Sequence, residues 1–200
     1  MTQILTADAI APLFTRDDAY LCARWGRPVA PVVFGLADDS LAVFRAALRA
    51  VLADIRHPLT DTDPEMGANM MFFFAGDWPE LAEIPDLERL TGQPGLPARL
   101  AEAGADQYRI FRFDADGGIR ACLTFVRMGG VLHDAHPGAL AELLAVRAML
   151  TFAGDVRPSA QVAALLRAAY DPVMPVAARD PAHALRLAAR TGQPGERRAP

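Results

Sequence analysis

Hydrophobic residues recur every three or four positions between residues 41 and 55, the spacing of one face of an amphipathic helix. Asp38, Asp39 and Ser40 precede this stretch and are candidate N-caps. His57 ends it, because a residue that precedes a proline avoids the α conformation. The pattern therefore predicts a helix over about 40–56, and its buried face would consist of Leu41, Phe44, Leu48, Val51, Leu52 and Ile55.

Two other stretches have the composition of strands. Residues 69–75 (NMMFFFA) form a continuous apolar run between turn-forming residues, which is typical of a central strand buried on both faces. Residues 27–35 (RPVAPVVFG) are also rich in β-formers but contain Pro28 and Pro31. Proline cannot donate to a β-ladder, so we expect this strand at an edge or beginning with a bulge.

The second half of the chain predicts a hairpin followed by helices. Residues 107–113 and 119–128 alternate bulky and polar side chains around the turn 114–118 (DADGG). A nearly all-apolar helix over 140–152 follows. Thereafter Ser159 caps a helix to Tyr170, and a last helix should cover about 181–190. Near the N-terminus, Thr6 caps a short helix over 7–13.

These elements predict an α+β fold, a small mixed sheet with a hairpin, packed by helices. One domain should span residues 1–190, and 191–200 should be a flexible C-terminal tail. The stretch 76–100 is dense in proline, glycine and acidic residues, so we expect it to be irregular apart from a short helix near 86–90. Because such long irregular stretches often carry function, residues 77–100 are predicted to form one wall of the main cleft or partner surface. The alternative is a lid that only packs its leucines on the core.

Composition narrows the possible partners. Of the 200 residues, 52% are hydrophobic and 22% are charged, and the formal charge is −4. No basic face stands out that could follow a phosphate backbone, so nucleic acid is not an expected partner. No apolar run reaches the roughly 18 residues of a membrane span, and the N-terminus lacks the pattern of a signal peptide. We therefore expect a cytoplasmic protein.

The reactive side chains exclude several classes of enzyme. Every one of the 20 basic residues is an arginine, so no lysine can serve as nucleophile, Schiff base or P-loop residue. The only serines, Ser40 and Ser159, both precede predicted helices and argue against a serine triad. Cys22 and Cys122 have no metal-binding spacing and are expected to be buried hydrophobes, with a disulfide between them as the alternative.

One cluster could bind a metal ion. His133, Asp134 and His136 lie before the apolar helix, and two neutral imidazoles three positions apart can face the same way to hold zinc or iron. The alternative is a polar loop in which Asp134 or His136 satisfies free N–H groups of the next helix. No other cofactor is indicated.

Several short motifs are similar to those of a known family. Residues 24–29 (RWGRPV) with Gly35 resemble its opening strand, Ala68-Asn69 resembles the start of its second strand, and 165–172 (LLRAAYDP) resembles one of its helix ends. The family is an uncharacterised bacterial domain of unknown function, often described as exported or as putative lipoproteins, with a zincin-like metallopeptidase layout. The resemblance, over about residues 13–189, implies the same layout here.

The apolar helix departs from that family's pattern. The family carries Glu-Glu-x-x-Gln on this helix, where zincins carry His-Glu-x-x-His, whereas this chain keeps at most Glu142. Without two helix histidines, zincin catalysis is not expected. Burying a lone glutamate is costly, so Glu142 should either face solvent or pair with an arginine such as Arg109, and we favour the pair.

The sequence therefore favours a non-catalytic domain that binds a protein or small-molecule partner. Candidate site residues are Glu142, Trp78 and Asn69. The alternative is a metal-dependent hydrolase that uses His133 and His136 with Asp134 or Glu142.

Overall fold

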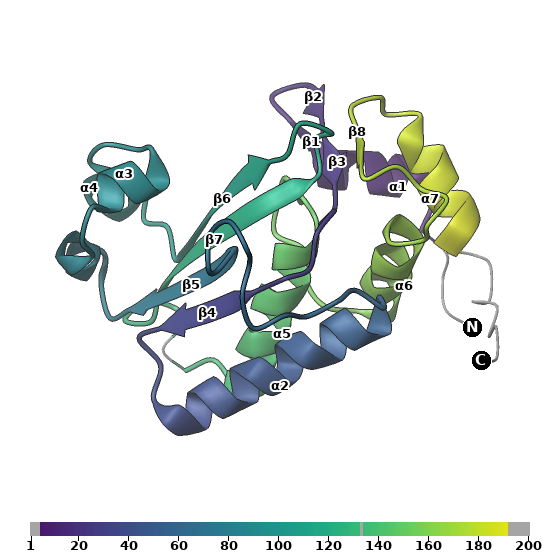
Figure 1. Ribbon diagram of the computed structural model, residues 1–200. Helices are drawn as coiled ribbons and strands as arrows, with labels where there is room; N and C mark the ends of the chain where they lie inside the picture. Colours follow the sequence, from purple (N-terminus) through teal and green to yellow (C-terminus); the bar gives the residue numbers. More distant parts are fainter. Residues whose placement is uncertain (1–4, 133, 192–200) are drawn as a thin grey trace.

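The computed structural model describes residues 5–132 and 134–191, and its centre is a four-stranded mixed sheet (Figure 1). The strand order is β4-β5-β7-β6, with bounds β4 Pro31–Phe34, β5 Met70–Ala75, β6 Gln107–Phe113 and β7 Ile119–Arg127. Strands β4 and β7 flank β5 in parallel, whereas β6 and β7 form the antiparallel hairpin. The α+β fold with a small mixed sheet and a hairpin is thereby confirmed. The zincin-like layout stays a prediction.

The positions of the two apolar strands follow from their sequences. The proline-containing strand β4 is an edge strand, as expected for a segment in which Pro31 has no N–H to donate to a ladder. Strand β5 lies inside the sheet, and Phe72 and Phe73 on its two faces are both buried. Because side chains alternate along a strand, the sheet builds one hydrophobic core on each face.

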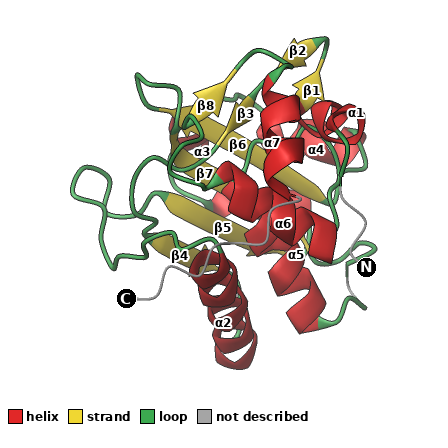
Figure 2. Cartoon of the chain, turned by 90° about the vertical axis from the view of Figure 1, so that its right-hand side faces the viewer, coloured by secondary structure: helices red, strands yellow, loops and turns green. Residues whose placement is uncertain are grey.

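Three helices cover the face that carries Phe72: α2 (Asp38–Asp54), α5 (Pro137–Met149) and α6 (Ala160–Ala169). In Figure 2, α2 and α5 lie below the strands and α6 lies in front of them, with α7 (His183–Thr191) beside α6. Phe44 of α2 meets Phe72 edge to face, with 4.6 Å between ring centroids, and Leu48 is buried with it. We refer to this side as the helix face.

Two helix termini differ from the predictions. The N-cap of α2 is Ala37, and Asp38 and Asp39 lie in the first turn, where carboxylates favour the positive end of the helix dipole. Helix α5 ends at Met149 instead of Phe152. Leu150 has an extended backbone and forms a β-bridge with Arg24, and the Thr151 hydroxyl donates to the Leu21 carbonyl. These contacts favour an extended chain after Met149, so the helix ends there.

The other face of the sheet is covered by the segment that we expected to be irregular. It forms the 3-10 helix η2 (Trp78–Glu83) and the helices α3 (Leu87–Thr91) and α4 (Leu96–Glu102). A capping box between Asp77 and Glu80 starts η2, and Gly92 ends α3 at a positive φ of 68°. Helix α3 confirms the short helix expected near 86–90, whereas η2 and α4 were not expected. The sequence did not reveal them because such short elements are built from caps and turns, which leave little hydrophobic periodicity.

The N- and C-terminal parts of the described chain pack together at one end of the molecule (Figure 2). The elements there are α1 Ala7–Ile10, η1 Ala11–Phe14, β1 Thr15–Arg16, β2 Ala19–Tyr20, β3 Cys22–Ala23, β8 Ala177–Ala178 and α7. Cys22 and Cys122 are buried free thiols, as expected, and form no disulfide. Thr191 is the last residue of α7, and the rest of the predicted tail lies outside the described residues. Within the described ranges, no helix has the length and apolarity needed to cross a membrane.

Candidate functional site

The three predicted site residues lie in different parts of the fold. Asn69 is fully buried before β5, where its Oδ1 accepts from Ala30 N at 2.8 Å and its Nδ2 donates to Asp63 at 3.0 Å. Trp78 is fully buried on the opposite face from α5, and its Nε1 donates to the Ala105 carbonyl at 2.8 Å. Both side chains therefore have a structural role in the fold.

Glu142 is exposed on the outer side of α5, and within the described chain it forms no ion pair. The favoured arginine pair was therefore wrong, and the solvent-facing alternative holds. The reason is its position near the start of the helix, where the outer face is not covered by the hairpin arginines. Arg109 instead donates to the Arg147 carbonyl at the other end of α5.

The candidate metal ligands do not form a recognisable site in the described part. His136 is the N-cap of α5, and its Nδ1 accepts from Gly138 N at 3.2 Å, the capping role that we gave as the alternative. Asp134 is exposed, and His133 lies outside the described residues. Among residues 5–132 and 134–191, no group of three His, Cys, Asp or Glu could hold a metal ion.

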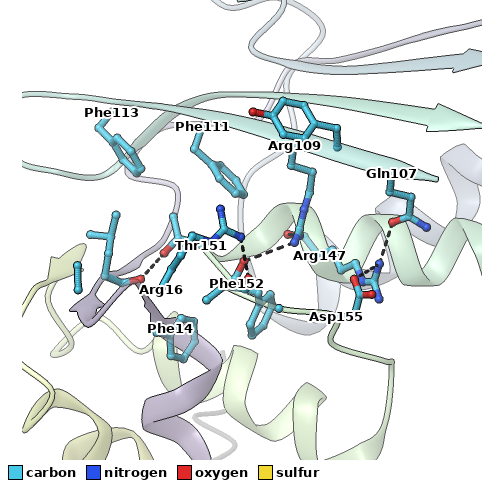
Figure 3. Close-up of a pocket in the computed structure, with 15 residues that line it drawn as sticks. Phe14, Arg16, Gln107, Arg109, Phe111, Phe113, Arg147, Thr151, Phe152 and Asp155 are labelled. Atoms are coloured by element: carbon cyan, nitrogen blue, oxygen red, sulfur yellow. Dashed lines mark hydrogen bonds and ion pairs between the residues drawn. The ribbon is translucent and has the colours of Figure 1, made fainter. Parts of the chain in front are cut away.

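A different cavity, of about 580 Å³, combines polar and aromatic groups. It lies at the edge of the sheet beside β6, between the C-terminal end of α5 and the β1–β2 hairpin (Figure 3). Its charged wall consists of Arg16, Arg109, Arg147 and Asp155, and its apolar wall includes Phe14, Leu21, Phe111, Phe113 and Phe152. We call it the arginine pocket.

Arg109 is the central charged group of this pocket. It lies half-buried on β6, and its guanidinium points toward the chain that follows α5, where Nη1 donates to the Arg147 carbonyl at 2.5 Å and Nη2 approaches the Phe152 carbonyl at 3.5 Å (Figure 3). No carboxylate in the described chain pairs with it. Burial is the main cause that lowers the pKa of Arg109, and the charges of Arg147 and Arg16 lower it further, whereas Cys122 and Asp155 raise it. An additional negative charge beside the buried guanidinium would therefore be favourable.

Arg16 approaches the same segment from β1. Its Nη2 donates to the Ala153 carbonyl at 2.7 Å, next to the Phe152 carbonyl that Arg109 approaches. Arg16 is exposed and, like Arg109, has no carboxylate partner among the residues described. Two guanidinium groups thus meet at two consecutive carbonyls, and neither forms an ion pair with an acidic side chain of the described chain, although the charge of Asp155 partly offsets that of Arg109.

Arg147 differs from these two because it forms an ion pair with a carboxylate. Its Nε donates to the Val156 carbonyl at 2.8 Å, and its Nη1 contacts Gln107 Oε1 at 2.8 Å and Asp155 Oδ1 at 3.1 Å. The side chain of Asp155 is 90% exposed, so this ion pair lies at the rim of the pocket.

The C-terminal end of α5, which forms the floor of the pocket, is fixed by side chains. The last carbonyls of a helix lack partners within it and need others when they are buried. Here Arg109, Trp25 and Tyr170 donate to three of them, those of Arg147, Ala148 and Met149. Arg109 therefore also has a structural role as a helix cap.

The apolar wall is built from aromatic rings on two sides. Phe14 and Phe152 stack with 5.3 Å between their centroids, and both are buried. Opposite them, the centre of the Phe111 ring lies 5.9 Å from the Arg109 guanidinium carbon, and Phe113 is partly exposed further along the strand (Figure 3). Thr151 adds no free hydroxyl, because its oxygen is bonded to Ala23 N and the Leu21 carbonyl.

Part of this site could have been found from the sequence. Residues 109, 111 and 113 alternate along the predicted strand and must share one face. The alternation was recognised only as a hairpin signal, and nothing in the pattern places Arg16 or Arg147 beside them. Their meeting depends on how the N-terminal hairpin and α5 pack against β6.

Comparisons of the chain with family models, with curated proteins and with solved structures find no match. The resemblance to the uncharacterised bacterial family therefore stays a prediction.

Proposed function

We propose that this protein is a non-catalytic binding domain for a small organic acid, which it holds in the arginine pocket. The observation that carries the proposal is the pair Arg16 and Arg109, two guanidinium groups that meet at one place without a carboxylate partner in the described chain. Like charges placed together disfavour each other, and an anion between them would relieve this cost.

The backbone hydrogen bonds of these two arginines leave further N–H donors that can bind a ligand. A guanidinium carries more N–H donors than the carbonyls here accept, since Arg16 makes one hydrogen bond and Arg109 two. The backbone contacts fix the orientation of both groups, which lowers the entropy lost when a ligand binds. Carboxylates and phosphates match the planar fork of a guanidinium.

The aromatic wall indicates the rest of the ligand. A cavity of about 580 Å³ has the size of ordinary small-molecule sites, and such sites combine apolar walls with a few oriented polar groups. Phe14, Phe111 and Phe152 would contact an apolar or aromatic body while the acid group lies against the arginines. We therefore favour an acid with a compact apolar or aromatic body.

The lining side chains support binding in preference to catalysis. Nucleophilic catalysis needs a nucleophile beside a base, and the only hydroxyl candidate besides Tyr108, that of Thr151, is held by two backbone groups. Asp155 is the lining carboxylate, and it pairs with Arg147. No observation favours the alternative of a metal-dependent hydrolase at His133 and His136.

Matched pairs of compounds test this proposal. Phenylacetate and phenylacetamide, and equivalent pairs with aliphatic bodies, differ mainly in charge, and ligand-observed NMR followed by calorimetry measures their binding to the full chain. We expect the acids to bind and their amides to bind about tenfold to a hundredfold more weakly, because hydrogen bonds to charged groups are worth about 1.5–3 kcal/mol.

Two variants on one strand provide the control. Arg109→Gln should weaken acid binding to the level of the amides. Arg112→Gln removes the same charge from an exposed arginine on the other face of β6 and should leave binding unchanged. Equal binding of acids and amides, or equal binding of the acids to wild type and Arg109→Gln, would overturn the proposal.

A further inference from the structure

A row of aromatic residues crosses the sheet on the face opposite the helix face. Phe34 of β4, Phe73 of β5, Phe125 of β7 and Tyr108 of β6 are successive register partners across the four strands. The rings of Phe34 and Phe73 stack with 5.0 Å between centroids, and so do those of Phe73 and Phe125. Short helices bury the inner part of this row, but its outer end is open.

The open end is Phe34, whose surface is 48% exposed although its ring packs on Phe73. It lies at the end of an edge strand and borders a cavity of about 510 Å³, whose other walls include Leu81, Ile84 and Leu90. The next residue, Gly35, has a positive φ of 82°, and a Cβ there would lie 1.9 Å from the Phe74 carbonyl oxygen. The backbone therefore holds Phe34 at this rim, and we call the cavity the apolar groove.

Negative charge surrounds the apolar groove. Residues 77–102, which form its outer wall and the helices behind it, contain six acidic residues and two arginines, a net charge of −4 that equals the net charge of the whole chain. Glu80 and Glu83 line the groove itself. The Glu80 carboxylate is held in place by the backbone N–H groups of Gly76 and Asp77.

We propose that the apolar groove docks a segment of a partner protein that carries an aromatic or long aliphatic anchor beside arginine or lysine. The anchor would extend the aromatic row by packing on Phe34, and the basic side chains would face Glu80 and Glu83. An apolar centre with a charged rim is the usual arrangement of such sites, in which the anchor gives affinity and the charges select the partner.

A second copy of this chain is a poor occupant for the same reason. A symmetric pair would place the same surface of both copies together, so two acidic rims would face each other. Like charges across an interface cost free energy and lower the association rate. The groove is also independent of the arginine pocket, because the two lie on opposite faces of the sheet.

The probe is a phage-displayed library of short random peptides, selected against the full chain and counterselected on Phe34→Ser. Selected sequences are then synthesised and their dissociation constants are measured. We expect enrichment of an aromatic or aliphatic anchor next to arginine or lysine. Affinity should fall about tenfold in Phe34→Ser, as for an anchor contact, and about threefold in Glu83→Gln. Raising NaCl from about 50 mM to about 300 mM should also weaken binding.

The matched control is Leu185→Ser, which removes another exposed hydrophobic residue, 65% exposed on α7 and outside the groove. It should leave peptide binding and acid binding unchanged. Any of three results would overturn the proposal. The selection yields no peptides that depend on Phe34, the selected pool lacks basic residues, or the chain forms a concentration-dependent dimer that Phe34→Ser abolishes. Acid binding should be the same in Phe34→Ser and wild type.

Discussion

The arginine pocket and the apolar groove occupy opposite faces of one sheet and differ in how their walls are built. In the pocket, polar groups are held by backbone carbonyls from distant segments, so Arg16, Arg109 and Arg147 gather around the end of α5. In the groove, apolar rings are held by strand register, and the charges are side chains of one contiguous segment. The same scaffold thus presents a positively charged cavity on one side and an acidic apolar surface on the other.

The difference indicates two kinds of ligand. A charged group in a cavity lined by aromatic rings selects a small molecule that can enter the cavity, because the walls can exclude water around a single acid. A half-exposed ring beside surface carboxylates selects a larger partner that covers it from outside. Substitutions on each face can test whether the two differ in this way.

The largest expected effect is the difference in unfolding free energy between a substitution at a buried position and one at a partly exposed position. Leu48→Ala, on the helix face, should lower the free energy of unfolding by about 2–5 kcal/mol, because a buried side chain is lost and a cavity remains. Phe34→Ala, at the open groove, should cost less than about 1 kcal/mol, as is usual for partly exposed positions. Urea unfolding of both variants measures the difference.

Equal losses in the two variants would contradict the comparison, since they would mean that Phe34 belongs to a closed core. A small loss in Leu48→Ala would mean instead that α2 does not pack on β5. Leu185→Ala, at an exposed position on α7, serves as the reference for a surface substitution.

The helix face was more predictable from the sequence than either candidate site. The periodicity of α2, the apolar run of β5 and the turn of the hairpin are local signals, and each determined its element. Pairings such as β3 with β8 involve two residues on each side, too few to show alternation. They exist because the ends of the described chain pack together, which no local pattern reveals.

The sites depend on such distant pairings. Glu142 is the one acidic residue of an apolar helix, and because it is exposed, its carboxylate needs no partner within the protein. Arg109 was considered only as a partner for Glu142, since its true acceptors are carbonyls at the far end of α5. Backbone acceptors leave no signature in a sequence, so an arginine that binds them cannot be distinguished from a surface arginine.

Low pH should cause a smaller loss of stability, and this loss should begin in α7 and not in the helices beside the apolar groove. Burial lowers the pKa of both His183 and His57, and the Nε2 atom of His183 has no hydrogen-bond partner in the described chain. The folded state therefore favours the neutral rings. Their contribution to stability is complete above the pKa of an unfolded histidine, about 6.5, and is lost as the pH falls below it.

Urea unfolding at about pH 7.5 and about pH 5.5 should show lower stability at the lower pH. Hydrogen exchange should show the loss first in α7, which carries His183 and packs on α1 and α6, and not in η2, α3 or α4 beside the groove. The double variant His57→Gln with His183→Gln should flatten this pH dependence. An unchanged slope, or earlier exchange in the groove helices, would show that other groups govern acid stability.

The smallest expected effect concerns Asp155, which pairs with Arg147 at the rim of the arginine pocket although its side chain is 90% exposed. Its carboxylate competes with a ligand acid for the same group of arginines. Asp155→Asn should therefore raise the affinity for phenylacetate about twofold to fivefold, since an exposed ion pair is worth about 0.2–1 kcal/mol.

Asp86→Asn makes the same change of charge at an exposed pair with Arg89, beside the groove. It should leave acid binding unchanged but weaken the binding of basic peptides slightly, so the two variants should have opposite selectivity. Calorimetry with both ligands on both variants measures this. If Asp86→Asn raises acid affinity as much as Asp155→Asn does, net charge alone controls binding, and the two faces do not act as separate sites.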